Sequence, residues 1–215
     1  ILNNHKDEKL IIDEGVDPTK IFVWAPFFQS FLDVPRKDEI GHTLVFYGGM
    51  ARQENYLSAI WFIEKVMPLL EDTDVKLQIV GANPDKSLFK YESDRVEIVG
   101  FAERVEDYLS KGMCLVAPLV LGAGVKIKVI ESMSAGLPVL TNKIGIEGIP
   151  AEDKKDFFFC ETPEEYADVI RGMLSGQYDV AEISRNSKAF IEEYFNYEKS
   201  AKQFAELLHQ LAGEA

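Results

Sequence analysis

The stretch Pro118-Leu-Val-Leu-Gly-Ala-Gly-Val-Lys-Ile-Lys-Val-Ile-Glu-Ser-Met-Ser-Ala-Gly-Leu-Pro-Val139 carries the pattern that decides the fold. The apolar run 113–117 just before it predicts a buried strand, which Pro118 ends. The loop Gly122-Ala-Gly124 then opens directly into a helix predicted over 126–135. Gly136 stops this helix, and a further strand is predicted over 138–141. Strand, glycine loop, helix and strand in this order indicate a βαβ unit with parallel strands.

The glycine loop and the start of the helix form a candidate anion site. Small residues let the backbone approach a ligand, and the first N–H groups of a helix have no partner within it. Lys126 and Lys128 fall in the first turn, where the helix dipole makes a positive charge unfavourable unless an anion is bound. A bound diphosphate explains both lysines. The alternative is an ordinary β-to-α turn with solvated lysines.

Glu131 lies further along the same helix. Its negative charge cannot help to bind phosphate, but its carboxylate can accept two hydrogen bonds from the vicinal hydroxyls of a ribose. Considered by itself, the residue is more typical of a solvated glutamate on a helix surface. The neighbouring anion site is what favours the ribose interpretation.

Outward from this stretch, strand-like and helix-like segments alternate from about Thr43 onward. Such alternation implies right-handed crossovers, so the predicted fold class is α/β, a Rossmann-like parallel sheet with helices on both faces. Parallel sheets bind ligands at the carboxyl ends of their strands, which selects the loops 48–55, 81–85, 100–103, 118–125 and 141–148. Strands are predicted over 44–47, 76–80, 95–99, 113–117, 138–141 and 157–160, and helices over 55–70, 103–110, 126–135, 163–174, 180–194 and 198–211.

Two predictions concern the helices near the end of the chain. Thr162, Pro163 and Glu165 predict a capping box at the start of the helix over 163–174. In the last helix, the apolar residues expected to face inward are Ala201, Phe204, Leu208 and Leu211.

Three regions are expected along the chain. Residues 1–40 do not fit the alternation, apart from one possible strand over 20–24, and are interpreted as an interdomain connector or the remnant of a missing N-terminal domain. The first residue is Ile1 rather than Met, so sequence is expected to be missing ahead of it. Residues 41–195 form the predicted Rossmann-like domain, and residues 196–215 a C-terminal helix that packs toward the N-terminal domain.

Composition excludes several classes of protein. A formal net charge of −13 argues against sequence-independent binding to nucleic acid or anionic lipid, because both need clustered Lys and Arg. No stretch approaches the run of about 18 apolar residues that a membrane span needs. Cys114 and Cys160 lie in apolar stretches and are expected to be free core thiols in a reducing compartment, which favours a cytoplasmic location.

The segment Gly122 to Val139 resembles the signature of retaining glycosyltransferases with the GT-B fold, group-1 type. In one large subgroup the helix reads Gly-Gly-x-Arg/Lys-x-Lys, two hydrophobic residues, then Glu-Ala-Met-Ala-x-Gly-x-Pro-Val-Val. The similarity continues in order through most of the globular part, from about Val45 to Leu208. It includes the segments 46–49, 61–62, 66–69, 78–84, 99–101, 108–109, 116–119, 144–148 and 195–197, together with Asn55.

The resemblance implies the C-terminal, nucleotide-sugar-binding half of such an enzyme, and it implies a role for each matching residue. Glu131 matches the glutamate that holds the donor ribose, and Lys126 and Lys128 match the residues that stabilise the leaving diphosphate. The remaining donor-binding residues fall in three groups. They are Gly48, Gly49 and Arg52 near the phosphates or sugar, Gly100, Phe101 and Ala102 at the base, and Gly122, Ala123, Gly124, Val125 and Ile127 in the loop and helix start.

The chain departs from the family at one position. The family's other glutamate, which contacts the transferred sugar, lies eight positions before the ribose glutamate, and Ala123 stands there. The identity of the sugar is therefore left open.

For the full-length protein, the resemblance implies transfer of a hexosyl group with retention of configuration, in polysaccharide or glycoconjugate biosynthesis. The acceptor, a glycan or glycolipid, is expected on the missing N-terminal domain, so this fragment alone is expected to be inactive. No metal and no cofactor is required beyond the donor substrate, because lysines and helix N–H groups supply positive charge. The expected location is cytoplasmic, with peripheral attachment to the inner membrane through the absent domain as an option.

Three other classes of protein compete with this interpretation. A nucleotide-sugar epimerase of the same fold needs carboxylates and a histidine in the cleft, and no such pattern is present. A non-catalytic assembly or sensing domain gives no reason for two lysines at a helix start. A response-regulator-like or dinucleotide-binding domain needs an acidic pocket or a GxGxxG turn, and Gly48-Gly-Met-Ala51 supplies neither.

Overall fold

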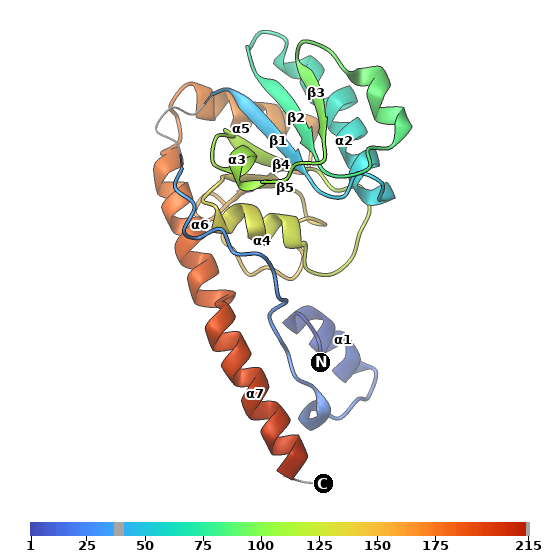
Figure 1. The fold of residues 1–215 in the computed structure, drawn as a ribbon, viewed down its shortest axis with the longest axis vertical. Coiled ribbons are helices and arrows are strands. Elements are labelled where there is room, and N and C mark those ends of the chain that lie inside the picture. Colours follow the sequence, from blue (N-terminus) through green and yellow to red (C-terminus); the bar gives the residue numbers. More distant parts are fainter. Residues whose placement is uncertain (37–40, 214–215) are drawn as a thin grey trace.

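Six parallel strands form one sheet in the part of the chain that the computed structural model describes, residues 1–36 and 41–213. Their order is β3-β2-β1-β4-β5-β6 (Figure 1). The order runs outward from the centre and reverses between β1 and β4, as in doubly wound nucleotide-binding folds. The predicted fold class is confirmed. The strands are β1 (Thr43–Tyr47), β2 (Lys76–Val80), β3 (Val96–Gly100), β4 (Cys114–Ala117), β5 (Val139–Thr141) and β6 (Phe158–Phe159).

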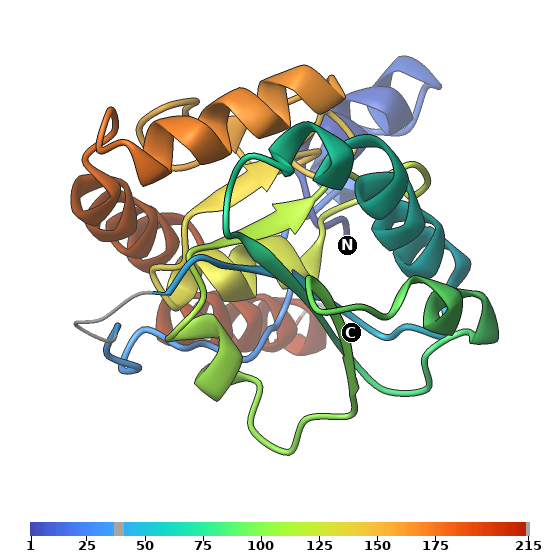
Figure 2. The same ribbon diagram turned by 90° about the horizontal axis from the view of Figure 1, so that it is seen from above.

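Helices cover both faces of the sheet, as Figure 2 shows from above. One face carries α2 and α5, the other α3 and α4, and α6 contributes to both hydrophobic clusters. The α-helices are α1 (His5–Asp13), α2 (Gln53–Lys65), α3 (Glu106–Leu109), α4 (Ile127–Ser134), α5 (Pro163–Leu174), α6 (Val180–Tyr194) and α7 (Tyr197–Gly213), and the 3₁₀ helices are η1 (Pro18–Lys20), η2 (Met67–Leu70) and η3 (Lys86–Tyr91).

Successive side chains of a strand point to opposite faces of the sheet, so the hydrophobic core is divided into two layers. Leu44 and Phe46 of β1 pack into the cluster under α2 and α5, whereas Val45 between them packs into the cluster under α4. All three are fully buried, and each contributes about 1.5–3 kcal/mol relative to an exposed side chain. Because both faces are covered, β1 reads as a continuous apolar run.

Most predicted elements agree with the structure, and the differences have local causes. The helix predicted over 55–70 is divided into α2 and η2, because Pro68 lacks an N–H and its ring cannot be placed inside an α-helix. The helix predicted over 103–110 is a single turn, α3. The capping box of α5 is confirmed, with the Thr162 side chain and the Glu165 backbone N–H paired. Cys114 and Cys160 are free and buried, as predicted.

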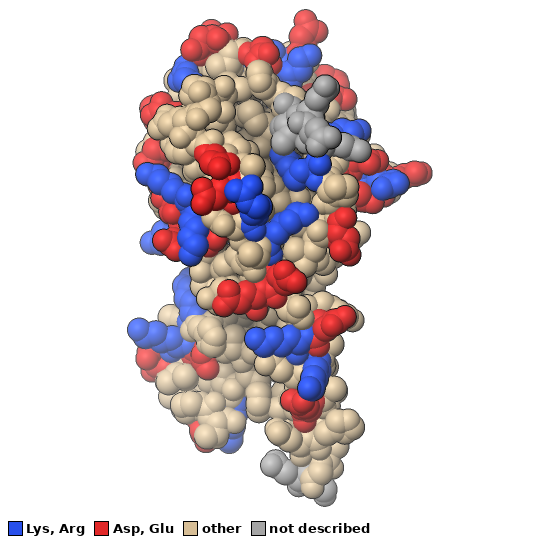
Figure 3. Space-filling view, turned by 90° about the vertical axis from the view of Figure 1, so that its left-hand side faces the viewer, with Lys and Arg blue, Asp and Glu red and all other residues tan. Residues whose placement is uncertain are grey.

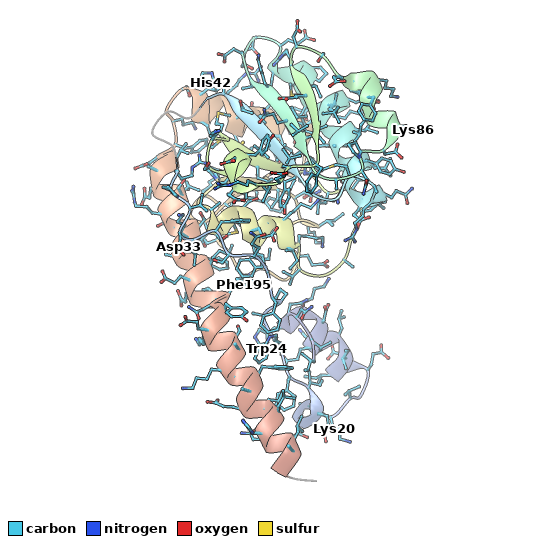
Figure 4. All side chains as sticks on the ribbon, viewed as in Figure 1. Lys20, Trp24, Asp33, His42, Lys86 and Phe195 are labelled. Atoms are coloured by element: carbon cyan, nitrogen blue, oxygen red, sulfur yellow. The ribbon has the colours of Figure 1, made fainter. Side chains whose placement is uncertain are left out.

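The N-terminal segment differs most from prediction. The strand expected over 20–24 is wrong, since only Val23 forms an isolated bridge, to Leu2. The helix α1 was not predicted, and none of its residues is buried. Trp24 packs edge-on against Phe204 of α7 at 5.0 Å, and Figures 1 and 4 show α7 running beside this segment, away from the sheet.

Residues 25–36 are anchored to the sheet domain by hydrogen bonds between side chains and backbone groups. The N–H of Phe31 donates to Ser134 Oγ at 2.9 Å, and the Arg36 guanidinium donates to the carbonyls of Leu109 and Gly112 at 2.7 and 2.8 Å. This segment therefore lies over the end of α4 and the turn before β4. The division of the chain at residues 40 and 195 remains a prediction.

The inward face of α7 is corrected by the structure. Leu208 and Leu211 are about half exposed, at 51% and 53%, whereas Leu207 is buried. The helix packs on the narrow N-terminal segment instead of a sheet, so its contact line passes through Phe204 and Leu207. Among the described residues, no helix is long and apolar enough to cross a membrane.

Candidate functional site

A cavity of about 580 Å³ opens at the carboxyl ends of β1 and β4, where the strand order reverses. The loops that leave these neighbouring strands run to opposite faces of the sheet, which leaves a crevice between them. The cavity is lined by Tyr47, Gly48, Gly49, Arg52, Glu54, Asn55, Leu119, Leu121, Gly122, Ala123, Val125, Lys126, Ile127, Lys128 and Glu131. Two loops far apart in sequence and the start of α4 thus meet at one place.

Lys128 lies deep in this cavity. Its ammonium donates to Asn55 Oδ1 and lies 5.2 Å from the centroid of the Phe46 ring. Gly48 makes room for it, because a Cβ at that position would come within 3.1 Å of Lys128 Nζ. Burial lowers the pKa of Lys128 to about 8, while the nearby Glu54 carboxylate acts in the opposite direction.

The depressed pKa of Lys128 predicts proton uptake when an anion binds. Near pH 8 about half of the Lys128 side chains are neutral, and a diphosphate in the cavity favours the charged form. We expect about half a proton to be taken up per nucleotide at pH 8, and affinity to fall as pH rises above 8. Calorimetry in buffers of different ionisation enthalpy measures the uptake. Proton release at pH 8 would contradict the assignment of Lys128 to the anion.

The same pKa has a consequence for stability. The folded-state pKa lies below the unfolded value, so between about pH 8 and 10.5 the unfolded chain binds more protons than the folded one. Stability from this residue therefore rises with pH across that window. Below pH 8 the fold carries the full cost of a buried ammonium, which a bound anion relieves.

Lys126 lies at the N-cap position of α4, with its side chain turned back along the glycine loop. Its ammonium donates to the carbonyl of Gly124 at 2.5 Å and lies 3.6 Å from Glu147 Oε2. Burial lowers the pKa of Lys126, and the Glu147 carboxylate partly offsets that effect. Gly122, with φ of +137°, permits the close approach, since a Cβ there would lie 3.1 Å from Lys126 Cε.

Glu131 reaches the cavity from the next turns of α4 and is buried, with 8% of its surface exposed. Burial raises the pKa of Glu131, and the neighbouring Tyr47 hydroxyl and Gln29 backbone N–H act against that shift. The carboxylate keeps lone pairs for a further donor.

Tyr47 and Asn55 are site residues that the sequence reasoning did not assign. Tyr47 is the last residue of β1, the place where a parallel strand delivers its side chain to a ligand crevice. Asn55 lies in α2 and donates to the carbonyl of Gly49 at 2.8 Å, which ties the first loop to Lys128. The place of Tyr47 at the end of a predicted strand could have identified it from the sequence as a site residue. Nothing in the sequence indicated that Asn55 contacts Gly49 and Lys128.

A second cavity, of about 340 Å³, adjoins the first and shares Tyr47, Gly48 and Gly49 with it. Phe101 and Ala102 line it, and Phe101 is 72% exposed. Gly100 ends β3 just below, where its carbonyl accepts from the Gly81 N–H at 2.7 Å. The loops predicted for the base and for the diphosphate are therefore adjacent.

Two predicted residues are placed less directly. Arg52 lines the first cavity, but its side chain is 74% exposed and pairs with Glu54. Gly124 belongs to the loop at the cavity, and its N–H donates to Glu147 Oε2 at 3.0 Å. Over residues 1–36 and 41–213, no three His, Cys, Asp or Glu side chains gather in an arrangement that could hold a metal ion.

Charges on the outer surface are mixed. Figure 3 shows Lys and Arg interspersed with Asp and Glu over the face on which α6 and α7 lie. The overall balance is acidic, at −13. The two lysines of the cavity, Lys126 and Lys128, are thus a local feature at the start of α4.

Comparison with known proteins gives a consistent result. The sequence model described as "Glycosyl transferases group 1" matches residues 41–176. An uncharacterized 44.6 kDa protein in the cps region of Klebsiella pneumoniae is 24% identical over 193 residues, covering 85% of this chain and 48% of that protein. The amylovoran biosynthesis glycosyltransferase AmsK of Erwinia amylovora is 28% identical over 150 residues, which cover 65% of this chain and 35% of AmsK. The chain therefore spans half or less of the length of these relatives.

Solved structures agree on the fold. Anabaena Alr3699/HepE, in complex with UDP and glucose, has a TM-score of 0.75 at 14% identity, with 97% of this chain and 62% of that chain covered. The pneumococcal O-GlcNAc transferase GtfA, in complex with UDP and GlcNAc, has a TM-score of 0.77 at 13% identity. The match covers 98% of this chain and 44% of the GtfA chain. At these identities the similarity concerns the architecture alone.

Proposed function

This chain belongs to the group 1 glycosyltransferases, and from that premise we propose that the cavity between β1 and β4 binds the nucleotide diphosphate of a sugar donor. The observation that carries the proposal is the convergence of Lys126, Lys128 and Glu131 on one cavity at the reversal point of the sheet. The two ammonium groups and the loop N–H groups receive the diphosphate, and Glu131 receives the ribose hydroxyls. The base lies in the adjoining cavity beside Phe101 and Ala102.

For the full-length protein, we propose hexosyl transfer from the donor to an acceptor with retention of configuration. Charge develops on the diphosphate as the sugar leaves, and Lys126 and Lys128 stabilise it. The arrangement supplies this positive charge from the chain itself, so we propose that neither a metal ion nor another cofactor takes part. The lysines are already held by Asn55 and Gly124, so little reorganisation is needed at that moment.

The acceptor and its chemistry belong to this proposal as well. One relative is named for amylovoran biosynthesis and another for a cps region, which supports a role in making a polysaccharide or glycoconjugate. The acceptor, a glycan or glycolipid, binds to a separate N-terminal domain, so the present chain binds donor without transferring sugar. The reaction takes place in the cytoplasm, with attachment to the inner membrane through that N-terminal domain.

The proposal is tested by calorimetry of the chain with UDP, GDP and ADP and with their common sugar conjugates. At least one nucleoside diphosphate is expected to bind, and its monophosphate more weakly, because the diphosphate contacts both lysines. Circular dichroism confirms that the protein is folded. Failure of all three diphosphates to bind to folded protein would overturn the donor-binding function.

Replacing Glu131 by alanine is expected to remove selectivity for the ribose. The wild-type protein should bind a ribonucleoside diphosphate about tenfold or more tightly than its 2′,3′-dideoxy form, and Glu131→Ala should reduce that ratio toward one, since charged hydrogen bonds of this kind contribute ~1.5–3 kcal/mol. Calorimetry with both ligands measures the ratio. Tyr47→Phe serves as the comparison, since it removes the hydroxyl beside Glu131 while keeping the carboxylate. An unchanged ratio in Glu131→Ala would exclude the ribose role.

A further inference from the structure

Glu147 lies in the connection between β5 and β6, and three different parts of the chain meet at its carboxylate. Its Oε2 accepts from the Gly124 N–H at 3.0 Å and lies 3.6 Å from Lys126 Nζ. Its Oε1 pairs with the ammonium of Lys6 in α1. The side chain is 21% exposed, so these contacts are partly shielded from solvent.

These contacts place Glu147 behind the glycine loop instead of inside the cavity. Lys126 and the neighbours of Gly124 line the donor cavity, and Glu147 is absent from its lining. The glutamate therefore acts on a ligand through Lys126 and through the loop backbone. The loop has need of such support, because Gly124 has a φ of +70° and a Cβ there would meet no atom within 4 Å.

We propose that Glu147 is a positioning residue for donor binding, which fixes the Gly124 peptide and the Lys126 ammonium in the arrangement that receives the diphosphate. Lys6 in turn orients Glu147, so the N-terminal segment supports the donor loop. This inference rests on the proposed donor-binding function. It gives a role to the Ile144–Gly148 segment that the sequence resemblance left without one.

The charge of Glu147 matters as much as its reach. Lys126 has 10% of its side chain exposed and lies near two other cations, Lys6 of α1 and Lys128 in the first turn of α4. Glu147 is the carboxylate that opposes these effects, and its contact raises the pKa of Lys126. Without this charge, Lys126 loses its proton at a lower pH and is free to leave the loop.

The test uses Glu147→Gln, whose amide oxygen still accepts from the Gly124 N–H, whereas the negative charge and the second oxygen, which pairs with Lys6, are lost. The probe is UDP, or GDP or ADP if wild type binds that nucleotide more tightly. We expect affinity about fivefold weaker at pH 7, with the ratio to wild type growing toward pH 9. Glu152→Gln is the matched control, because Glu152 is exposed and its ion-pair partner is the exposed Lys155.

A double-mutant cycle with Lys126→Met separates positioning from general damage. In the Lys126→Met background, Glu147→Gln is expected to change the UDP affinity by less than about twofold, because its effect passes through Lys126. An equal loss in both backgrounds, or equal or tighter UDP binding by Glu147→Gln across the pH range, overturns the inference. The donor-binding function fails separately, when no nucleotide binds to wild type or when Lys126 and Lys128 can be removed without loss.

Discussion

Replacing Lys126 and Lys128 together by alanine is expected to weaken nucleoside diphosphate binding by tenfold or more. Each lysine makes a charge-assisted contact to the diphosphate, and such a contact contributes ~1.5–3 kcal/mol. Lys128 is the more buried of the two, so its contact is less screened by solvent and salt. Calorimetry with the tightest-binding diphosphate measures the loss, and the nucleoside alone should bind as before.

The matched control removes two positive charges from the amino ends of the strands, opposite to the end at which the cavity opens. Lys76 and Lys111 are exposed and lie at or just before the amino ends of β2 and β4, away from the cavity. Alanine at both positions should leave the diphosphate affinity within about twofold, since long-range effects of exposed charges are largely screened. Equal losses in the two double variants would mean that net charge, and not the cavity, governs binding.

Gly81→Ala is expected to lower the free energy of unfolding by about 3 kcal/mol or more. Gly81 follows β2 with φ of +152°, and a Cβ there would lie 1.6 Å from the carbonyl oxygen of Gly48. That oxygen belongs to the backbone of the neighbouring loop, so it cannot turn aside as a flexible side chain could. The displaced Gly48 would also disturb Asn55 and Lys128, so binding should be lost with stability.

Urea denaturation measures this change, with Gly49→Ala as the comparison in the same loop cluster. At Gly49 the nearest atom to an added Cβ is Arg52 Cδ at 3.9 Å, so the expected loss of stability is below about 1 kcal/mol. Equal denaturation midpoints for the two variants would show that the β1 and β2 loops do not approach each other as closely as described.

The candidate site depends on elements that the sequence predicts unequally. The loop before α4 was identified from Gly122, Gly124 and the two lysines, because a glycine turn entering a helix has a local signature. Glu147 lies 21 residues beyond Lys126 in the printed sequence, and nothing in its own neighbourhood indicates a contact with that lysine. The same holds for Gln29, whose N–H supports Glu131 from the N-terminal segment.

The sequence predictions for the two ends of the chain, which missed α1 and assigned the wrong inward face to α7, fail for a common physical reason. The helix α1 has no buried residue, and α7 has only Leu207 buried, so neither helix packs on a broad apolar face of the sheet. Periodicity predicts which face of a helix is buried only when a broad apolar surface covers it. Here the contact is a narrow one between aromatic rings, Trp24 with Phe204 and Phe27 with Tyr197.

By itself, the sequence determined the parallel α/β fold and the loop that precedes α4, and its resemblance to a known signature indicated the group 1 glycosyltransferases. The fold and the loop follow from strand and helix periods and from glycine and lysine spacing, which are local properties of the chain. Only the tertiary structure decided that Lys126, Lys128 and Glu131 share a cavity with Tyr47 and Asn55, and that Glu147 supports the loop from behind. Such contacts depend on how separate crossovers pack on the sheet, and no local pattern specifies them.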